Sequence, residues 1–214
     1  MPDARVVNSP LRPYLVKSFE TLFTRYSPEW ITLALEMVEE HRELMAGDFT
    51  VKFPDAGTRL NFDEALADKI ETDTTILAPL LYRIAHGIFR RDPQHAALPY
   101  FAQVMKLRTG MEIYYSTVIG PRFLVMHGIG TVVGPRSVIG SDFMIYQGVT
   151  LGQRRVLQPH ERMVIGDHCT VFAGAKLIGN LRIGDHVNVG ANAVLLADAE
   201  SNSTYAGIPA VKVR

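Results

Sequence analysis

The sequence lacks three features: a second cysteine, an excess of either charge, and a long apolar run near its start. Cys169 is the single cysteine among 214 residues, which excludes an internal disulfide framework and a cysteine-rich zinc site. Lysine plus arginine and aspartate plus glutamate both total 22, so the net charge of +0 gives no reason to expect nucleic acid or anionic lipid as a partner. The first 20 residues mix Arg5, Arg12, Pro10 and Pro13 with apolar positions, which is typical of neither a signal peptide nor a membrane span. We therefore expect a soluble protein of the cytoplasm that binds neither nucleic acid nor membranes.

The composition changes near residue 110. Hydrophobic residues make up 47% and charged residues 21% of the chain, which is enough apolar material for a buried core. Before residue 110 glycine is sparse and apolar residues fall at helical spacing, whereas after it glycine recurs and β-branched residues dominate. The sequence therefore predicts a mainly β protein with an α-helical N-terminal part: a helical domain over 1–109 and a second domain over 110–214.

Several helices are expected in the first half. Pro28 and Glu29 suit the first turn of a helix, and Gly47 is expected to end it. Within the helix predicted over 75–89, Pro79 suggests that the regular helical turns begin only at that residue. Further helices are predicted over 15–26, 63–70, 75–89 and from 92 toward 108, with a loop over 49–60.

From residue 133 onward the sequence follows a period of six. A six-residue unit is too short for a helical repeat and is typical of a parallel β-helix, with three short strands in each coil and aliphatic side chains inside. The aliphatic series are Val133, Ile139, Ile145, Leu151 and then Ile165, Val171, Leu177, Ile183, Val189, Leu195. A second, mostly small or apolar position follows four residues later, at Ser137, Phe143, Val149, Cys169, Ala175, Leu181, Val187 and Ala193.

The period breaks twice, and each break carries one histidine. Between 125 and 133 the chain has two residues too many, and His127 lies there between Met126 and Gly128. Between 151 and 165 it has fourteen residues where a multiple of six is expected, and this polar, basic excursion contains His160. Loops on a rigid scaffold are common places for chemistry. Both breaks are therefore candidate parts of a functional site.

His127 is the strongest candidate for a catalytic residue. An imidazole titrates near neutral pH and can take a proton from an alcohol and return it to a leaving group. Its position in a glycine-flanked bulge favours a general base, and a partly buried structural histidine is the alternative. His160, taken alone, is a surface-loop histidine. His168 and His186, 18 residues apart, should stack at one corner of adjacent coils, either as half a metal site or as solvated turns. Cys169, at an inward position, is expected in the core.

Five segments in a fixed order carry a resemblance to a known family. On them, roughly residues 79–214 resemble the hexapeptide-repeat acyltransferases, and most closely the serine acetyltransferases. The repeat alone indicates only the superfamily, whereas its combination with the histidine bulge is specific. Residues 1–78 resemble the family only in being helical. The segments are YRIAH at 82–86, HGIGTVVG at 127–134, GVTLG at 148–152, GAKLIGN at 174–180 and AGIPA at 206–210.

The resemblance implies a left-handed parallel β-helix, a homotrimer or a dimer of trimers, and transfer of an acetyl group from acetyl-CoA to a small hydroxylated acceptor. It places the family's general base at His127 and its orienting carboxylate at Glu112, where the family usually has aspartate. A carboxylate on the far ring nitrogen fixes the tautomer of the imidazole and stabilises the imidazolium. A second family histidine corresponds to His160, which the neighbouring subunit would supply to the acceptor or to the tetrahedral intermediate.

The resemblance also implies that CoA lies in the groove between adjacent β-helices, mostly on backbone amides at coil corners. Small residues there allow the pantetheine arm to approach the backbone. Lys176 and Lys212 are candidate partners of the CoA phosphates, with solvated surface lysines as the alternative. We expect no metal. The corresponding backbone positions are Gly152, Ala173, Ala191 and Gly207.

Two positions depart from the family pattern. The family holds serine with an aspartate directly before the catalytic histidine and an arginine directly before the loop histidine, and here these positions are Met126 and Pro159. Desolvating a zwitterion without its charged partners costs several kcal/mol. We therefore expect an acceptor other than serine: a larger, less polar alcohol or amine, such as a sugar or a biosynthetic intermediate. Arg154, Arg155 or Arg162 could supply the missing cation.

Three other functions stay open. A zinc carbonic anhydrase of the same fold needs two histidines about five residues apart on neighbouring strands, and the sequence has no such pair. A non-catalytic trimeric scaffold would need none of His127, Glu112 and His160. An N-acyltransferase would use the same machinery on an amine.

Overall fold

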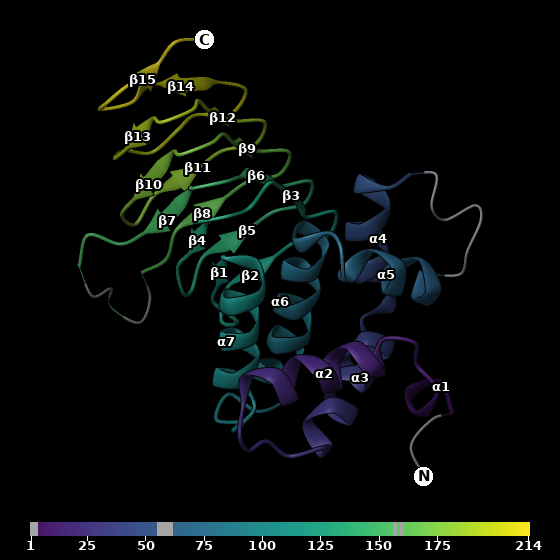
Figure 1. The fold of residues 1–214 in the computed structure, drawn as a ribbon. Coiled ribbons are helices and arrows are strands. Elements are labelled where there is room, and N and C mark those ends of the chain that lie inside the picture. Colours follow the sequence, from purple (N-terminus) through teal and green to yellow (C-terminus); the bar gives the residue numbers. More distant parts are fainter. Residues whose placement is uncertain (1–3, 55–61, 156–157, 159–160) are drawn as a thin grey trace.

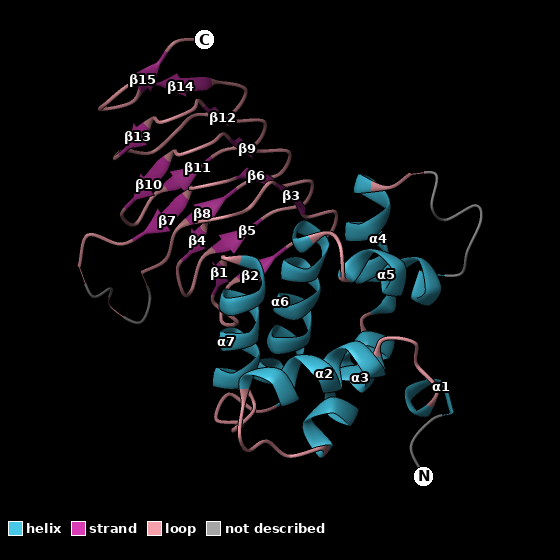
Figure 2. Cartoon of the chain, viewed as in Figure 1, coloured by secondary structure: helices cyan, strands magenta, loops and turns pink. Residues whose placement is uncertain are grey.

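Helices form the N-terminal half of the molecule. The computed structural model describes residues 4–54, 62–155, 158 and 161–214 (Figure 1). In these residues no helix is both long and apolar enough to cross a membrane. Helices α6 and α7 stand side by side below the strands (Figure 2). The bounds are α1 Ala4–Val7, α2 Arg12–Leu22, α3 Glu29–Glu40, α4 Arg42–Lys52, α5 Phe62–Ile70, α6 Thr74–Arg91 and α7 Leu98–Thr109.

Short parallel strands stacked in coils form the C-terminal half. Each coil adds a strand to a first sheet (β1-β4-β7-β10-β13), a second (β2-β5-β8-β11) and a third (β3-β6-β9-β12-β14). Strand β15 closes the third sheet and pairs with β14 in the antiparallel sense. The predicted left-handed parallel β-helix after a helical N-terminal part is confirmed. The bounds are β1 Glu112–Ile113, β2 Val118–Ile119, β3 Leu124–Met126, β4 Val132–Val133, β5 Val138–Ile139, β6 Met144–Tyr146, β7 Thr150–Gly152, β8 Val164–Ile165, β9 Thr170–Val171, β10 Lys176–Ile178, β11 Arg182–Ile183, β12 Asn188–Val189, β13 Val194–Leu195, β14 Thr204–Ala206 and β15 Val211–Lys212.

The six-residue period marks the residues that fill the β-helix. Every aliphatic residue of the two predicted series, and every residue of the second position, is at most 4% exposed. In the register, Ile165 pairs with Ile183, a coil of 18 residues. Val125 pairs with Ile145, 20 residues on, so the bulge at His127 adds two residues to its coil. The inward aliphatic residues stay in register across both insertions, as the pairs Val125 with Ile145 and Ile139 with Ile165 show.

Gly47 does not end a helix, contrary to the sequence prediction. The break comes earlier, at His41, where the backbone leaves helical geometry with φ −107° and ψ 23°. Gly47 then lies inside α4, where burial of Met45 and Phe49 outweighs the low helix propensity of glycine. The predicted loop over 49–60 is helical as far as Lys52, and its part over 55–60 lies outside the described residues.

The predicted helices over 63–70 and 75–89 are confirmed as α5 and α6, with one difference. Helix α6 begins before Pro79, because the Asp73 side chain caps it by accepting a hydrogen bond from the Thr75 amide at 2.9 Å. The helix expected from Asp92 begins only at Leu98. Its start is delayed because the Asp92 carboxylate instead accepts from the Gln94 amide at 2.9 Å and forms a turn.

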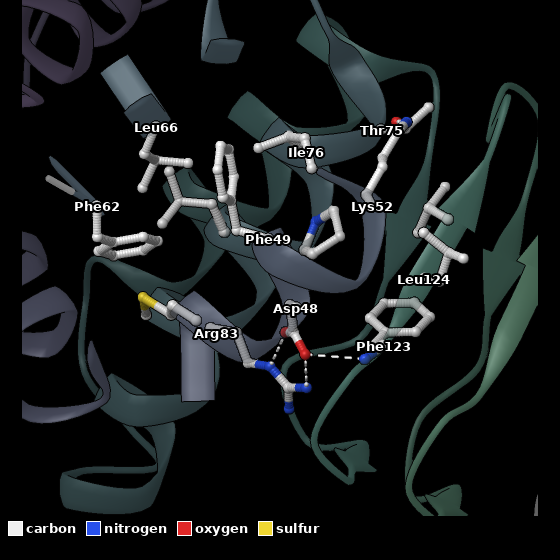
Figure 3. Close-up of a pocket in the computed structure, with 14 residues that line it drawn as sticks. Asp48, Phe49, Lys52, Phe62, Leu66, Thr75, Ile76, Arg83, Phe123 and Leu124 are labelled. Carbon is white, nitrogen blue, oxygen red and sulfur yellow. Dashed lines mark hydrogen bonds and ion pairs between the residues drawn. The ribbon is translucent and has the colours of Figure 1, made fainter. Parts of the chain in front are cut away.

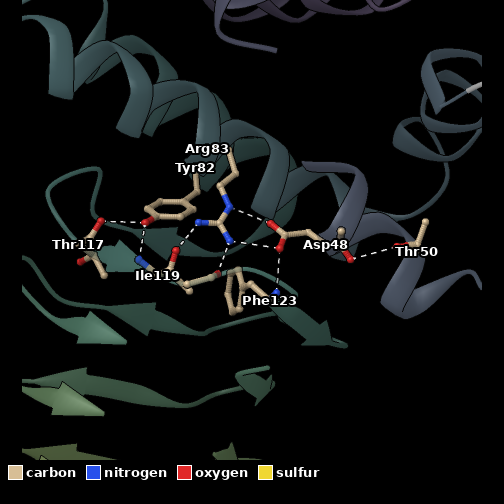
Figure 4. Close-up of polar contacts among 9 residues, drawn as sticks. Asp48, Thr50, Tyr82, Arg83, Thr117, Ile119 and Phe123 are labelled. Atoms are coloured by element: carbon tan, nitrogen blue, oxygen red, sulfur yellow. Dashed lines mark hydrogen bonds and ion pairs between the residues drawn. The ribbon is translucent and has the colours of Figure 1, made fainter. Parts of the chain in front are cut away.

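A buried ion pair joins the two halves (Figure 4). Arg83 Nε of α6 lies 2.8 Å from Asp48 Oδ2 of α4, and neither side chain is more than 6% exposed. The same guanidinium donates to the carbonyls of Ile119 and Gly120 at 2.5 and 2.7 Å. Asp48 in turn accepts from the Phe123 amide at 2.8 Å. The helical half therefore holds the turn that precedes β3, the strand that leads to His127.

The space beside this ion pair is almost filled (Figure 3). A cavity of about 20 Å³ lies among α4, α5, α6 and β3, which is room for about one water molecule. On the other side, the Tyr82 hydroxyl donates to the Thr117 carbonyl at 2.8 Å and accepts from the Ile119 amide at 3.1 Å. Burial raises the pKa of Tyr82, so the hydroxyl stays protonated and keeps both bonds at neutral pH.

Candidate active site

His127 lies in the outward bulge between β3 and β4. Its φ is +65°, and Gly128 and Gly130 have φ of +74° and +76°, so the bulge is built largely from left-handed backbone. A Cβ on Gly128 would come within 2.5 Å of Met111 Sδ, so the chain needs glycine there. His127 is exposed, and within the described residues its ring has no hydrogen-bond partner. The predicted base is therefore presented to solvent on a fixed piece of backbone.

Glu112 begins the strand below this bulge. Its amide donates to the Thr131 carbonyl at 2.9 Å, and the Gly130 amide donates to the Gly110 carbonyl at 2.9 Å. The Thr131 hydroxyl also donates to the Tyr146 carbonyl at 2.8 Å, which ties the end of the bulge to the next coil. The end of the His127 bulge is thus hydrogen-bonded to the stretch of chain that carries Glu112.

The Glu112 carboxylate, however, contacts a lysine rather than His127. Its Oε2 lies 2.7 Å from Nζ of Lys106, a residue in the last turn of α7. The hydrogen bond to Glu112 raises the pKa of the Lys106 amine, so the lysine is charged at neutral pH. The pair lines a depression of about 240 Å³ between α7 and β1. Sequence reasoning missed Lys106, because its contact with Glu112 depends on how α7 docks against the first coil.

His160 and Pro159 lie outside the described residues. The described residues of this excursion include Arg154 and Arg155, whose side chains both have partners. Arg155 pairs with Glu161 at 2.6 Å, and Arg154 donates to the Leu196 carbonyl at 2.8 Å. Of the three cations that could replace the missing arginine of the family, Arg155 thus pairs within the excursion and Arg154 binds a coil of the β-helix.

Three of the four predicted CoA backbone positions, Ala173, Ala191 and Gly207, follow one corner of the β-helix. The Asn192 amide donates to the Ala173 carbonyl at 2.8 Å, and the Gly174 amide donates to the Gln147 carbonyl at 2.8 Å. These bonds stack the corners that carry Ala173 and Ala191 above the corner between the third and first sheets where His127 lies. Gly207, with φ +94°, follows β14 at the same corner, whereas Gly152 is the last residue of β7 and lies at the opposite end of that strand.

The two candidate lysines differ in surroundings. The Lys176 amine donates to the Gly148 carbonyl at the same corner. Lys212 pairs with Glu200 at 2.6 Å on an exposed surface. Lys176 is therefore placed beside the corner that carries the other predicted CoA positions, whereas Lys212 has an acidic partner of its own.

An apolar strip runs from Met126 along the outer face of the third sheet. Met126 pairs in register with Tyr146, and the Tyr146 ring stacks on Phe172 with centroids 5.2 Å apart. Phe172 is 36% exposed, which is high for an aromatic residue on a sheet. Sequence reasoning missed Tyr146 and Phe172, although the period places both of them. Each directly follows an inward aliphatic residue, Ile145 or Val171, and must therefore point outward.

The other titratable candidates lie away from His127. His168 and His186 stack as predicted, with centroids 4.6 Å apart and planes 7° apart. Asp142 Oδ2 lies 3.5 Å from His168. Within the described residues no group of three or more histidine, cysteine, aspartate or glutamate side chains could hold a metal ion. Cys169 is buried, as predicted, and burial raises the pKa of its thiol.

Comparison with known proteins agrees with this architecture. The family model described as bacterial transferase hexapeptide (six repeats) matches residues 162–197. A serine acetyltransferase of Staphylococcus aureus is 37% identical over 150 residues, which is 69% of this chain and 70% of the relative. The family model lies within the β-helix, whereas the match of 150 residues is longer than the β-helix and must include part of the helical half.

Solved structures extend the likeness to nearly the whole chain. The serine acetyltransferase isoform 3 of Entamoeba histolytica, in complex with cysteine, superposes with a TM-score of 0.67 at 28% identity and covers 94% of this chain and 67% of its own. A serine acetyltransferase in complex with CoA has a TM-score of 0.68 at 23% identity and covers 97% of this chain and 93% of its own. The chain therefore belongs to the serine acetyltransferase family of hexapeptide-repeat proteins and is an acyltransferase.

Proposed function

We propose that this protein is a CoA-dependent O-acetyltransferase in which His127 is the general base. The observation that carries the proposal is the placement of His127: a solvent-presented imidazole on a fixed bulge, at the corner that also carries Ala173 and Ala191. A relative that was crystallised with CoA has the same fold. Acetyl-CoA is the donor, and no metal is needed for the steps below.

The reaction follows from the position of the base. His127 removes the proton of the acceptor hydroxyl as its oxygen attacks the thioester carbonyl of acetyl-CoA. The resulting tetrahedral intermediate collapses by breaking the carbon–sulfur bond, and the imidazolium returns the proton to the departing CoA thiolate. Glu112 stabilises the imidazolium, and His160 of a neighbouring subunit assists the acceptor or the intermediate. The reaction needs no oxidant and no reactant besides acetyl-CoA and the acceptor.

The donor is held along the corner above His127. Small residues let its pantetheine arm approach the backbone at Gly152, Ala173, Ala191 and Gly207. Lys176 and Lys212 bind its phosphates. The groove needs a second β-helix to close it, so the active form is a homotrimer or a dimer of trimers. Light scattering at micromolar concentration tests this point, and a fully active monomer would contradict it.

The division of the chain follows the change of structure. The last helix ends at Thr109 and the first strand begins at Glu112, so residues 1–109 and 110–214 form a helical domain and an acyltransferase domain. We expect the enzyme to act in the cytoplasm, where acetyl-CoA is available.

The acceptor is a small alcohol other than serine. Met126 and Pro159 stand where the family holds the two charges of serine. The apolar strip of Met126, Tyr146 and Phe172 instead offers an aromatic face beside His127, and such a face favours an alcohol with an apolar or planar part.

The test of this function is thiol release from acetyl-CoA with a panel of acceptors. L-serine, a hexose, 2-phenylethanol and 2-phenylethylamine span zwitterionic, polar, apolar and amine acceptors. We expect release with the alcohols that carry an apolar part and poor release with L-serine. Met126→Asp should raise L-serine acetylation about tenfold or more, since a charge-assisted hydrogen bond contributes about 1.5–3 kcal/mol.

Each other outcome has a definite meaning. An ordinary KM for L-serine in the wild type would overturn the acceptor assignment and leave the acyltransferase. Faster release with the amine than with the matched alcohol would indicate N-acetylation. Failure of the protein to bind CoA in calorimetry would favour a scaffold.

A further inference from the structure

The ion pair of Lys106 and Glu112 connects the helical half to the candidate active site. Helix α7 ends at Gly110, whose φ of +68° reverses the chain and whose amide donates to the Lys106 carbonyl at 3.0 Å. This ending places Lys106, in the last turn of the helix, beside the first residue of β1. Its ammonium then lies 2.7 Å from Glu112 Oε2.

The second carboxylate oxygen remains available. A carboxylate accepts hydrogen bonds on both oxygens, and within the described residues Glu112 Oε1 has no partner. The bulge of His127 is bonded to this same stretch of chain through Gly130 to Gly110 and through Glu112 to Thr131. The free oxygen and the unpartnered imidazole therefore belong to two segments that are fixed to each other.

The length of the glutamate explains why a third group is needed. Glutamate has one more rotatable bond than aspartate, so its carboxylate has more positions to choose among and loses more side-chain entropy when it is fixed. A cation that holds one oxygen removes most of that freedom. Among the described residues that line the depression, Lys106 and Glu112 are the charged side chains, and Tyr114 and Tyr115 are the other titratable groups.

We propose that Lys106 is a positioning residue for the acetyl transfer: it holds Oε2 of Glu112 so that Oε1 can accept a hydrogen bond from the imidazole of His127 and fix its tautomer. The inference rests on the proposed role of His127. It makes the orientation of the base depend on a side chain of the helical half.

The test reads the imidazole directly and needs no acceptor. Full-length protein labelled with ¹⁵N at its 7 histidines is assigned with a His127 variant, and the ring nitrogen shifts of His127 are recorded where the ring is neutral. A ring held by a carboxylate shows one dominant tautomer. We expect Glu112→Gln and Lys106→Met to move the shifts toward a mixture of tautomers, and Lys106→Arg to leave them as in the wild type. Turnover of Lys106→Met should fall about tenfold, since a misplacement of about 1 Å can cost up to about 10²-fold.

Two controls separate positioning from a general effect. Lys69 pairs with Asp68 at 2.9 Å on the surface of α5, so Lys69→Met removes a similar ion pair elsewhere and should leave the His127 shifts and turnover unchanged. In the double variant Lys106→Met with Glu112→Gln, the shifts and the turnover should match those of Glu112→Gln alone, because Lys106 acts only through Glu112.

The proposal fails if Lys106→Met has the wild-type spectrum, if its loss of turnover adds to that of Glu112→Gln, or if wild type and Glu112→Gln have the same spectrum. These outcomes are distinct from failure of the proposed function. If His127 is not the general base, His127 variants keep wild-type turnover, whatever the spectra of the Lys106 variants show.

Discussion

Leu177 in the β-helix and Arg83 in the helical half are both buried, but different interactions hold them there. Leu177 occupies one position of a repeating period, and its neighbours above and below are Leu151 and Leu195, residues of the same kind. Arg83 is held by the Asp48 carboxylate and by the carbonyls of Ile119 and Gly120, partners that come from two distant places in the chain. The β-helix is therefore a scaffold of equivalent positions, whereas the helical half depends on particular partners.

The site draws on both kinds of structure. The scaffold presents His127 where its period is interrupted, and the helical half reaches the same place through specific side chains. Arg83 holds the turn before β3, and Lys106 holds Glu112 after α7. The coils of the β-helix share the same six-residue period. The coil that carries His127 differs from the others through its bulge and through the contacts that Arg83 and Lys106 of the helical half make with it.

The largest expected effect on stability comes from breaking the partner-specific contact. Arg83→Met leaves Asp48 charged and buried without its cation, and such a loss typically costs about 3–5 kcal/mol. Urea unfolding should show this decrease. Arg91→Met, which removes an exposed arginine from the same helix, should change stability by less than about 0.5 kcal/mol. Adding Asp48→Asn to Arg83→Met should recover part of the loss, and equal losses for Arg83→Met and Arg91→Met would contradict the account.

A substitution at one inward position measures how much the stacked interior stabilises the β-helix. Leu177→Ala removes a fully buried side chain from the stack and should cost about 2–5 kcal/mol in the same unfolding experiment. Leu196, in the next coil, is 40% exposed, and Leu196→Ala should cost less than about 1 kcal/mol. If the two variants lose the same stability, the period does not define the core.

Replacing a glycine by alanine should change the stability in opposite directions at two positions, one in each half. Gly128 has φ +74° and no room for a Cβ, so Gly128→Ala should destabilise by about 1–3 kcal/mol and lower turnover by moving His127. Gly47 lies inside a helix, and a methyl group there would have Arg122 Cγ as its nearest neighbour, at 3.9 Å. Gly47→Ala should therefore stabilise by about 0.5–1 kcal/mol. Thermal melts and turnover of both variants test the pair, and a loss of activity in Gly47→Ala would be unexpected.

The smallest effect concerns a corner of the β-helix. The ion pair with Arg122 lowers the pKa of Asp142 below its usual value. A carboxyl whose pKa is lower in the folded state adds stability above its unfolded value, and this is lost as the pH falls through the folded value. Asp142→Asn should therefore be slightly less stable than the wild type at neutral pH and equal to it in strong acid. Melting temperatures at pH 7 and near pH 2 would show whether the difference disappears.

The β-helix could be predicted from the sequence because the six-residue period that defines it depends only on distance along the chain. The six-residue series places residues such as Val171 and Ile183 inside, and the two extra residues before Val133 place His127 in a bulge. The same rule would have placed Tyr146 and Phe172 on the outer face. Periodicity alone is sufficient for all of these positions, because each depends only on its distance along the chain.

The contacts of the helical half could not be predicted in this way. Asp48 and Arg83 are 35 residues apart and meet only because α4 packs against α6. The pairing of Lys106 with Glu112 depends on the reversal at Gly110, and the helix through Gly47 depends on tertiary packing. Such contacts follow from the crossing of elements, about which local propensity and period carry no information.

The most direct test of the account is the turnover of His127 variants at matched occupancy by acetyl-CoA. His127→Asn is the better variant, because asparagine tolerates the left-handed backbone at this position, and His127→Ala serves as its companion. The account predicts that thiol release falls by roughly 10²–10⁴-fold in both variants, while the dissociation constant for CoA stays close to that of the wild type. Wild-type turnover in His127→Asn would contradict the account.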